Sequence, residues 1–147
     1  MTESFFVFTD GGARGNPGPG AIGVVVKNHQ EKVLAKFGKF IDRVTNNVAE
    51  YQAVIEALKW LKEHKKTFDT DATFNFFLDS RLVVNQLNGL FKIKNSHLRD
   101  LIIQVRQLEK ETDVKILYRL IPREKNKDAD FLVNQTLNAN GKIASKL

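Results

Sequence analysis

Two aspartates each stand at the point where an apolar segment of the sequence ends. Asp10 follows SFFVFT and Asp79 follows ATFNFFL, and both segments are apolar at consecutive positions. Such runs are typical of strands that are buried on both faces of a sheet. If the two strands are parallel neighbours, both carboxylates lie at the same sheet edge, where α/β proteins bind their ligands. The spacing therefore predicts a pair of acids that can act on one ligand.

Glu50 is the third acid that the sequence places near this edge. It lies in the first turn of a predicted helix over residues 47–64, whose apolar stripe comprises Tyr51, Val54, Ile55, Leu58 and Leu61. Helical projection puts Glu50 at the border of that stripe, so its carboxylate can point back over the sheet. Three carboxylates this close repel one another unless a cation lies between them. Oxygen ligands without Cys or clustered His favour Mg²⁺ or Mn²⁺ over zinc.

Each of the three acids also has a purely structural alternative. Asp10 could serve the turn that follows it, and Asp79 could simply precede a helix N-cap at Ser80. Glu50 could complete a capping box with Asn47, because Asn-x-x-Glu satisfies two free amide groups at a helix start. Capping does not require acids at matching strand ends, however. A shared metal site therefore explains the three positions together better than three separate local roles.

The remaining pattern predicts one α/β domain with a mixed sheet and helices packed on it. Apolar or alternating runs predict five strands, at residues 4–10, 21–28, 32–41, 72–79 and 114–121. Ser80 is expected to cap the second of four helices, which are predicted at residues 47–64, 81–87, 97–111 and 127–138. We assign residues 1–138 to this domain and interpret residues 139–147 as a frayed C-terminal tail.

The composition is that of an ordinary globular protein, 42% hydrophobic and 27% charged over 147 residues. There is no cysteine, which excludes disulfides, thiolate catalysis and thiolate metal sites. No apolar stretch approaches the ~20 residues that a membrane-spanning helix needs, so we expect a soluble cytoplasmic protein without a membrane partner. The net charge of +6 is compatible with a polyanionic ligand, although charge alone does not identify one.

Three glycines match the G-x-G-x-x-G pattern of dinucleotide-binding proteins, namely Gly18, Gly20 and Gly23. That pattern must open a helix, whereas Gly23 leads directly into VVVK, which is a predicted strand. The sequence also contains no Walker motif and no G-x-S-x-G motif. We therefore exclude a dinucleotide site, and the chemistry rests on the acids.

Four longer segments carry these acids in a fixed order: TDGGARGNPGPGAIGVV, TNNVAEYQAVIEAL, LDSRLVVNQL and IPREKNKDADFLVN. Together they span residues 9–134 and resemble type 1 ribonuclease H. The short last loop and the absence of Cys are most similar to compact archaeal and archaeal-like ribonuclease HI. The resemblance implies a five-stranded mixed sheet in the order 3-2-1-4-5 with helices on both faces. It also implies endonucleolytic hydrolysis of the RNA strand of RNA/DNA hybrids, leaving 3′-hydroxyl and 5′-phosphate ends.

The resemblance also implies the roles of individual residues. Asp10, Glu50, Asp79 and Asp130 are the implied ligands of two Mg²⁺ ions, with Mn²⁺ as an alternative, on either side of the scissile phosphate. One ion would activate the attacking water, and the other would stabilise the departing 3′-oxygen. Arg123 stands where the best-known relatives carry a histidine on the last loop. It could position a phosphate or help the product leave, but it cannot exchange a proton near neutral pH.

Spacing alone does not decide which acid of KNKDADFLVN completes this set. Asp128 and Asp130 flank the buried stripe of the last helix on opposite borders. Either could instead be an acid of the first helical turn, where the helix dipole favours negative charge. The family's acid follows a small residue and precedes an apolar pair, and this resemblance selects Asp130.

The resemblance implies contacts between the hybrid and seven further residues, which are Gly11, Gly12, Asn16, Asn46, Asn47, Ser80 and Arg81. The two glycines would let the backbone approach the RNA strand, and Asn16 would reach a ribose 2′-hydroxyl. Asn46 and Asn47 would contact the wide minor groove, where 2′-hydroxyls distinguish RNA from DNA. Arg81 replaces the amide side chain of the best-known relatives.

We expect a monomeric enzyme, but two other functions stay open. The same fold could be a catalytically inactive hybrid-binding module, although such a module has no need of four mutually repelling acids. It could also be a nuclease that cuts double-stranded RNA as well, since Arg81 alters one discriminating contact. Lys92 and Lys94, in the reduced basic protrusion NGLFKIKNSH, could contact the hybrid or belong to an ordinary solvated loop.

Overall fold

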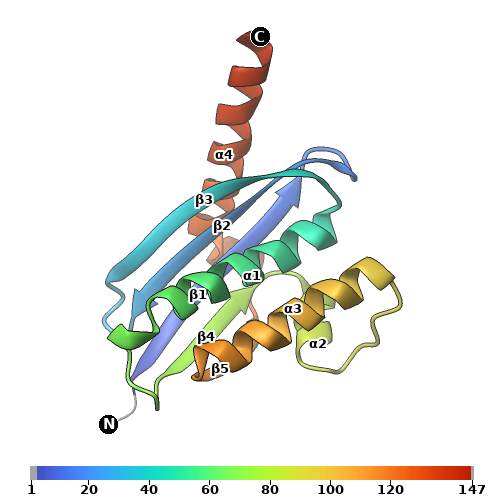
Figure 1. The fold of residues 1–147 in the computed structure, drawn as a ribbon. Helices are drawn as coiled ribbons and strands as arrows, with labels where there is room; N and C mark the ends of the chain where they lie inside the picture. The colour runs from blue at the N-terminus through green and yellow to red at the C-terminus, as the bar shows by residue number, and fades with distance from the viewer. Residues whose placement is uncertain (1–2, 147) are drawn as a thin grey trace.

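A five-stranded mixed sheet forms the centre of the molecule (Figure 1). The computed structural model describes the backbone of residues 3–146 and the side chains of residues 3–140. The strands are β1 (Ser4–Ala13), β2 (Gly18–Asn28), β3 (Val33–Val44), β4 (Thr73–Leu78) and β5 (Lys115–Leu120). Their order is β3-β2-β1-β4-β5, with β1–β2 and β2–β3 antiparallel and β1–β4 and β4–β5 parallel. The fold and strand order implied by the resemblance are confirmed.

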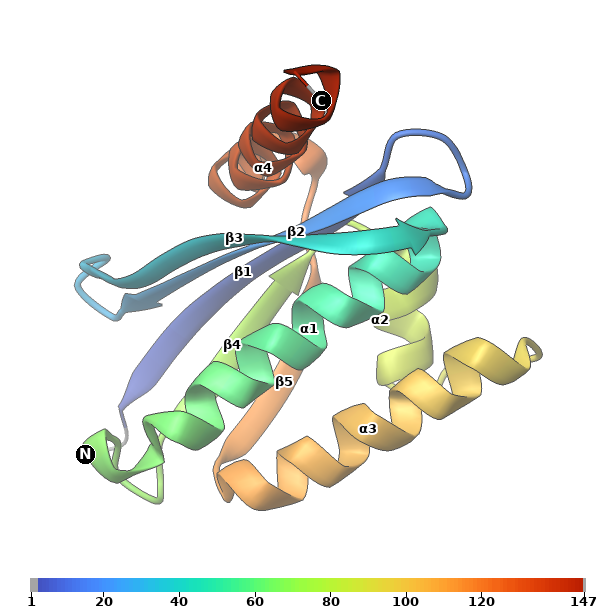
Figure 2. The same ribbon diagram turned by 45° about the horizontal axis from the view of Figure 1, so that its top comes forward.

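Helices cover both faces of the sheet, also as expected. One face carries α1 (Asn46–Glu63), α2 (Arg81–Leu87) and α3 (Ser96–Thr112), and the other carries α4 (Lys127–Lys146) (Figure 2). Two single 3₁₀ turns, η1 (Lys65–Thr67) and η2 (Arg123–Lys125), lie in the connections between helices and strands. Within the described residues, no helix has the length and apolar character needed to cross a membrane.

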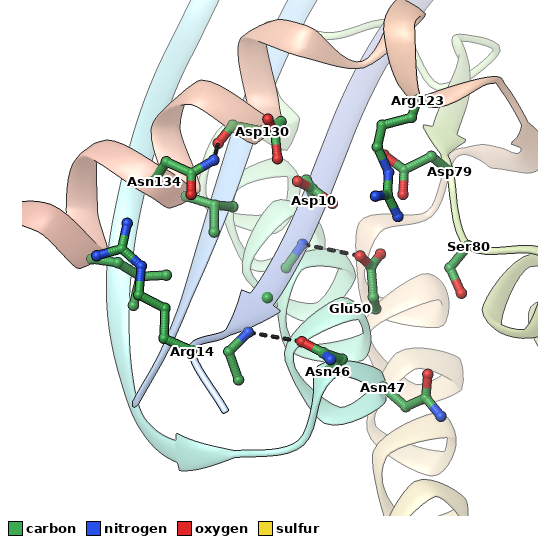
Figure 3. Close-up of a pocket in the computed structure, with 15 residues that line it drawn as sticks. Asp10, Arg14, Asn46, Asn47, Glu50, Asp79, Ser80, Arg123, Asp130 and Asn134 are labelled. Carbon is green, nitrogen blue, oxygen red and sulfur yellow. Dashed lines mark hydrogen bonds between the residues drawn. The ribbon is translucent and has the colours of Figure 1, made fainter. Parts of the chain in front are cut away.

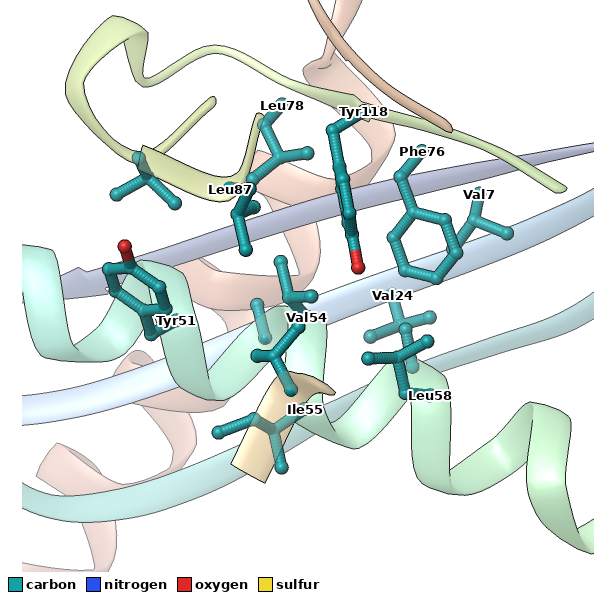
Figure 4. Close-up of a cluster of buried hydrophobic side chains, with 14 of the residues drawn as sticks. Val7, Val24, Tyr51, Val54, Ile55, Leu58, Phe76, Leu78, Leu87 and Tyr118 are labelled. Atoms are coloured by element: carbon teal, nitrogen blue, oxygen red, sulfur yellow. The ribbon is translucent and has the colours of Figure 1, made fainter. Parts of the chain in front are cut away.

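The main hydrophobic core lies between the sheet and α1. Val54, Ile55 and Leu58 of α1 belong to this core, to which the strands contribute Phe76 and Val7 among others (Figure 4). All of these side chains are at most 1% exposed. The apolar stripe read from the sequence is therefore the buried side of α1, and it fixes the rotation of this helix on the sheet. That rotation determines where Glu50 points.

The expected start of α1 is wrong by one residue. The helix begins at Asn46 and its N-cap is Thr45, whose Oγ1 accepts a hydrogen bond from the Val48 amide at 3.2 Å. The capping box between Asn47 and Glu50, which was the structural alternative for Glu50, is therefore not formed, and Glu50 is free for another role. By contrast, Ser80 caps α2 as expected, since its Oγ accepts from the Val83 amide at 3.3 Å.

The last helix is longer than the sequence suggested. We expected it to end at residue 138 and a frayed tail to occupy 139–147, but α4 continues as a helix to Lys146. Residue 147 and the side chains from residue 141 onward lie outside the part of the chain that the structure describes. The division into a domain of residues 1–138 and a tail stays a prediction.

The glycines that match a dinucleotide pattern lie in strand β2, so that pattern was correctly excluded. Gly23 has a packing role instead. A Cβ added to Gly23 would lie 2.3 Å from the Ala129 carbonyl oxygen, and one added to Gly38 would lie 2.3 Å from Thr136 Oγ1. Only residues without a side chain allow α4 to lie this close to β2 and β3. This close packing brings the first turn of α4 to the end of β1.

Candidate active site

The carboxylates of Asp10 and Asp79 meet at one end of the sheet. Asp10 lies in β1 and Asp79 directly follows β4, and these strands are parallel neighbours in which Phe8 pairs with Phe77. α1 packs over the same end and contributes Glu50. One carboxylate oxygen from each of the three acids lies within 4.8 Å of the others. The shared sheet edge that the sequence predicted is therefore present.

Asp130 lines the same cavity from the first turn of α4 (Figure 3). The cavity has a volume of about 440 Å³ and contains all four acids that the resemblance selected. Asp128 instead points to the far side of the helix, where one of its oxygens lies 3.8 Å from Lys27 Nζ. The geometry thus separates the two acids that spacing could not, with Asp130 at the cavity and Asp128 outside it.

Burial and neighbouring negative charges disfavour the ionised form of the carboxylates at this site. Asp10 is only 8% exposed. Its burial, together with the negative charges of Asp79 and Asp130, raises its pKa to about 7. A hydrogen bond with Glu50 opposes this rise. Burial and the neighbouring Asp10 also raise the pKa of Glu50 well above its usual value. Near neutral pH the protein without a cation therefore retains protons on this pair.

The donor set fits a hard divalent cation. Glu50 Oε1 accepts a hydrogen bond from the Gly11 amide at 3.3 Å, whereas no N–H or hydroxyl group among the described residues donates to the buried Glu50 Oε2. A buried carboxylate oxygen without a donor is unfavourable unless it coordinates an ion. No ion pair among the described side chains includes Asp10, Asp79 or Asp130. These three acids therefore keep ligand atoms that no salt bridge among the described side chains occupies.

Gly11 has a structural role that the resemblance did not imply. A Cβ at Gly11 would lie 2.1 Å from the Ala49 carbonyl oxygen and 2.7 Å from the Glu50 amide nitrogen. The space that its missing side chain leaves is occupied by the backbone of α1. Gly11 therefore allows the close approach of α1 that brings Glu50 to Asp10. Gly12 lines the cavity, and a Cβ there would make only an ordinary 3.7 Å contact with Val133.

A chain of asparagines connects the loop after β1 to the start of α1. Asn16 Oδ1 accepts a hydrogen bond from the Asn46 amide at 2.9 Å, and Asn46 Oδ1 accepts from the Ala13 amide at 2.9 Å. Asn46 and Asn47 line the cavity, while Asn16 supports its wall from outside. The β1–β2 loop and the first turn of α1 are thus held as one unit beside the acids.

Of the other residues that the resemblance implicated, Ser80 and Arg123 line the cavity and Arg81 does not. Arg123 reaches it from η2, on the same side as Asp79 in Figure 3. Arg81 is exposed at the start of α2. Lys92 and Lys94 lie in the exposed loop between α2 and α3 and do not line the cavity either.

Sequence patterns offered no reason to single out three polar residues at this site. Arg14 lines the cavity, and its Nη2 donates a hydrogen bond to Asn138 Oδ1 at 2.6 Å. Asn134 also lines it, one turn after Asp130. Asn126 is 1% exposed, and its Nδ2 donates a hydrogen bond to Asp79 Oδ2 at 3.2 Å. Asn126 stands just before the last helix, where its residue type indicates only a helix cap.

Comparison with known proteins places this geometry in a family. The reverse transcriptase-like family model matches residues 8–136. An RNase H1 isolated from compost by a metagenomic approach shares 37% of its sequence with this chain. Its structure superimposes with a TM-score of 0.87, covering 93% of this chain and 97% of that protein. The chain belongs to the type 1 ribonuclease H family.

Two further relatives are similar to this chain over most of its length. The RNase H1 of the halophilic archaeon Halobacterium salinarum is 34% identical, with a TM-score of 0.84 over 92% of this chain and 98% of that protein. A bifunctional protein of Mycobacterium tuberculosis is 39% identical over 137 residues. That match covers 92% of this chain but only 36% of the longer relative. The compost RNase H1 has also been solved in complex with an RNA/DNA hybrid.

Proposed function

We propose that this chain hydrolyses the RNA strand of RNA/DNA hybrids in a reaction that depends on Mg²⁺. The observation that carries the proposal is the group of Asp10, Glu50 and Asp79, each of which offers one carboxylate oxygen within 4.8 Å of the others. Family membership and the hybrid complex of the compost RNase H1 support the choice of substrate. The net charge of +6 is consistent with a polyanionic ligand.

The four acids of the cavity are the proposed ligands of two Mg²⁺ ions, for which Mn²⁺ can substitute. Their all-oxygen donor set suits these hard cations, and a second ion needs the additional carboxylate of Asp130 beside the group of three. When bound, such a pair supplies an activated water and charge stabilisation for an in-line displacement that leaves 3′-hydroxyl and 5′-phosphate ends. The protein contributes by holding the carboxylates fixed at one edge of the sheet.

Arg123 is the proposed phosphate contact of the site. Its side chain is exposed at the cavity, and a guanidinium can bind a phosphate through two parallel hydrogen bonds. Arg123 can position a phosphate or assist product release, whereas a guanidinium group is too basic to exchange a proton near neutral pH. Proton transfer near neutral pH must then involve water or another group.

Substrate choice is proposed to depend on the uncharged polar side chains of the cavity wall. Asn46, Asn47 and Ser80 line the cavity and offer side-chain hydrogen bonds. Contacts of this kind read the width of the minor groove and the 2′-hydroxyls, not the base sequence. We therefore expect cleavage with little sequence preference. Arg81 lies outside the cavity, so any contact it makes is with a more distant part of the duplex.

One cleavage assay tests the proposal against its alternatives. Labelled RNA/DNA, RNA/RNA and DNA/DNA duplexes are incubated with the protein, with and without Mg²⁺. We expect cleavage of RNA/DNA alone and only with the metal. Binding of the hybrid without cleavage would favour an inactive binding module, and equal cleavage of RNA/RNA would favour a nuclease of broader choice. Size-exclusion chromatography tests whether the protein is the expected monomer. We also propose that it is located in the cytoplasm.

A further inference from the structure

Asn126 is the most deeply buried polar side chain that touches the acid cluster without belonging to it. It lies between η2 and α4 and is 1% exposed. A buried amide is unfavourable unless its polar atoms are hydrogen-bonded, so the contacts of Asn126 indicate why this residue type is present.

One amide nitrogen of Asn126 connects the two strands that carry aspartates. Its Nδ2 donates to the Thr9 carbonyl oxygen at 2.9 Å and to Asp79 Oδ2 at 3.2 Å. Thr9 immediately precedes Asp10 on β1, and Asp79 follows β4. Both partners are acceptors, so the side chain must present its NH₂ group to them. Asn126 Oδ1 is consequently left buried without a partner.

The backbone of Asn126 extends the same connection to the fourth acid. Its carbonyl oxygen accepts a hydrogen bond from the Asp130 amide at 3.1 Å, and its own amide donates to the Arg123 carbonyl at 2.9 Å. A single buried residue therefore joins the segments that bear Asp10, Asp79, Asp130 and Arg123. Among the side chains of residues 3–140, no other donates a hydrogen bond to Asp79.

We propose that Asn126 is a positioning residue, which holds the Asp79 carboxylate at the distance from Asp10 that a shared divalent cation requires. Like-charged carboxylates move apart when nothing restrains them. The Asn126 NH₂ group restrains Asp79 with a neutral donor, and so leaves the net negative charge that attracts the cation. A cationic residue in its place would restrain Asp79 but would compete with the metal. The inference rests on the proposed function of the same site.

The test compares Asn126→Ala with Asn75→Ala. Asn75 is a matched control because its Nδ2 also links β4 to β1, donating to the Phe5 carbonyl at 3.2 Å, but away from the acids. The readout is the rise in melting temperature of the protein as Mg²⁺ is added without substrate. Supporting contacts of metal ligands typically contribute about 10- to 100-fold in affinity. We expect Asn126→Ala to shift the Mg²⁺ midpoint by roughly tenfold or more, and Asn75→Ala to leave it unchanged.

Asn126→Ser provides a second variant in case the alanine variant does not fold. Its hydroxyl can donate to only one of the two acceptors, so its Mg²⁺ midpoint should lie between those of the wild type and Asn126→Ala. Midpoints equal to that of Asn75→Ala in every Asn126 variant that folds would overturn the inference. A shifted midpoint in a protein whose wild type cleaves no hybrid would overturn the proposed function and leave the positioning role intact.

Discussion

Replacing Asp10 by asparagine should stabilise the protein when no metal is present. The pKa of Asp10 is raised from 3.8 to about 7, chiefly by burial. Since the folded protein holds this proton more tightly than the unfolded chain, stability falls as the pH rises from about 4 to about 7. At about 1.36 kcal/mol per pH unit, the full penalty at pH 8 is on the order of 4 kcal/mol. An asparagine side chain cannot ionise, so the variant avoids this penalty.

The measured gain should be smaller than this upper limit. Asparagine gives up the proton that Asp10 shares with Glu50, and removing one charge also eases the ionisation of Glu50. We expect about 1–3 kcal/mol at pH 8, which corresponds to roughly 3–10 °C in melting temperature for a domain of this size. At pH 5 the gain should fall to about two fifths of its value at pH 8, because most of the penalty develops above that pH.

Thermal melts in EDTA at pH 5 and pH 8 measure this effect. Asp128→Asn is the control, because Asp128 is an exposed acid outside the cavity and its removal relieves no crowding. Loss of stability in Asp10→Asn at pH 8, or a gain of equal size at both pH values, would contradict the reasoning. Added Mg²⁺ should reverse the ranking, since the wild type then gains the stabilisation of a bound ion.

Three further substitutions test the other parts of the site. Arg123→Ala should lower kcat roughly tenfold or more, the loss expected for one charged hydrogen bond to a phosphate, with an unchanged Mg²⁺ midpoint in melting experiments. Asp130→Asn should lose about tenfold or more of its cleavage rate at low Mg²⁺, whereas Asp128→Asn should stay within about a factor of two of the wild type. Gly11→Ala should cost on the order of 3 kcal/mol in denaturant unfolding, because its methyl group overlaps the Ala49 carbonyl.

Each of these substitutions has an outcome that would refute its premise. Unchanged turnover in Arg123→Ala would remove this residue from the substrate contacts. A greater loss in Asp128→Asn than in Asp130→Asn would mean that the wrong acid of α4 has been placed at the metal. Full stability and activity in Gly11→Ala would show that α1 can shift without displacing Glu50.

The acids at the sheet edge could be predicted from the sequence because local patterns determine them. The apolar run that stops at Asp79 marks the end of β4, and the helical stripe fixes the direction of Glu50. The run that stops at Asp10 indicated the correct edge, although the expected end of the first strand was wrong, since β1 continues to Ala13. The strand order came from the resemblance, since no local pattern specifies which strands pair. Selection of Asp130 over Asp128 also needed the resemblance, and the packing of α4 on β2 supports that choice.

The remaining features depend on contacts between distant segments. Gly11 is required by the backbone of α1, and the sequence around it shows only a flexible turn. Asn126 donates a hydrogen bond to the carbonyl oxygen of Thr9, which lies 117 positions earlier in the chain. Its local sequence context therefore indicates nothing beyond a helix cap. The error at the start of α1 is of another kind. Thr45 and Asn47 are both good N-cap residues, and local preference does not distinguish between them.

The chemistry of the cleaved ends tests the central claim most directly. A hybrid with separate labels on its RNA and DNA strands is treated with the protein and Mg²⁺, and the products are identified by mass spectrometry. Water activated at the acid cluster should cut only the RNA strand and leave 3′-hydroxyl and 5′-phosphate ends. Products with a 2′,3′-cyclic phosphate and a 5′-hydroxyl would mean that the ribose 2′-oxygen attacks instead. That result, or cleavage that persists in EDTA, would contradict a metal-dependent site at Asp10, Glu50 and Asp79.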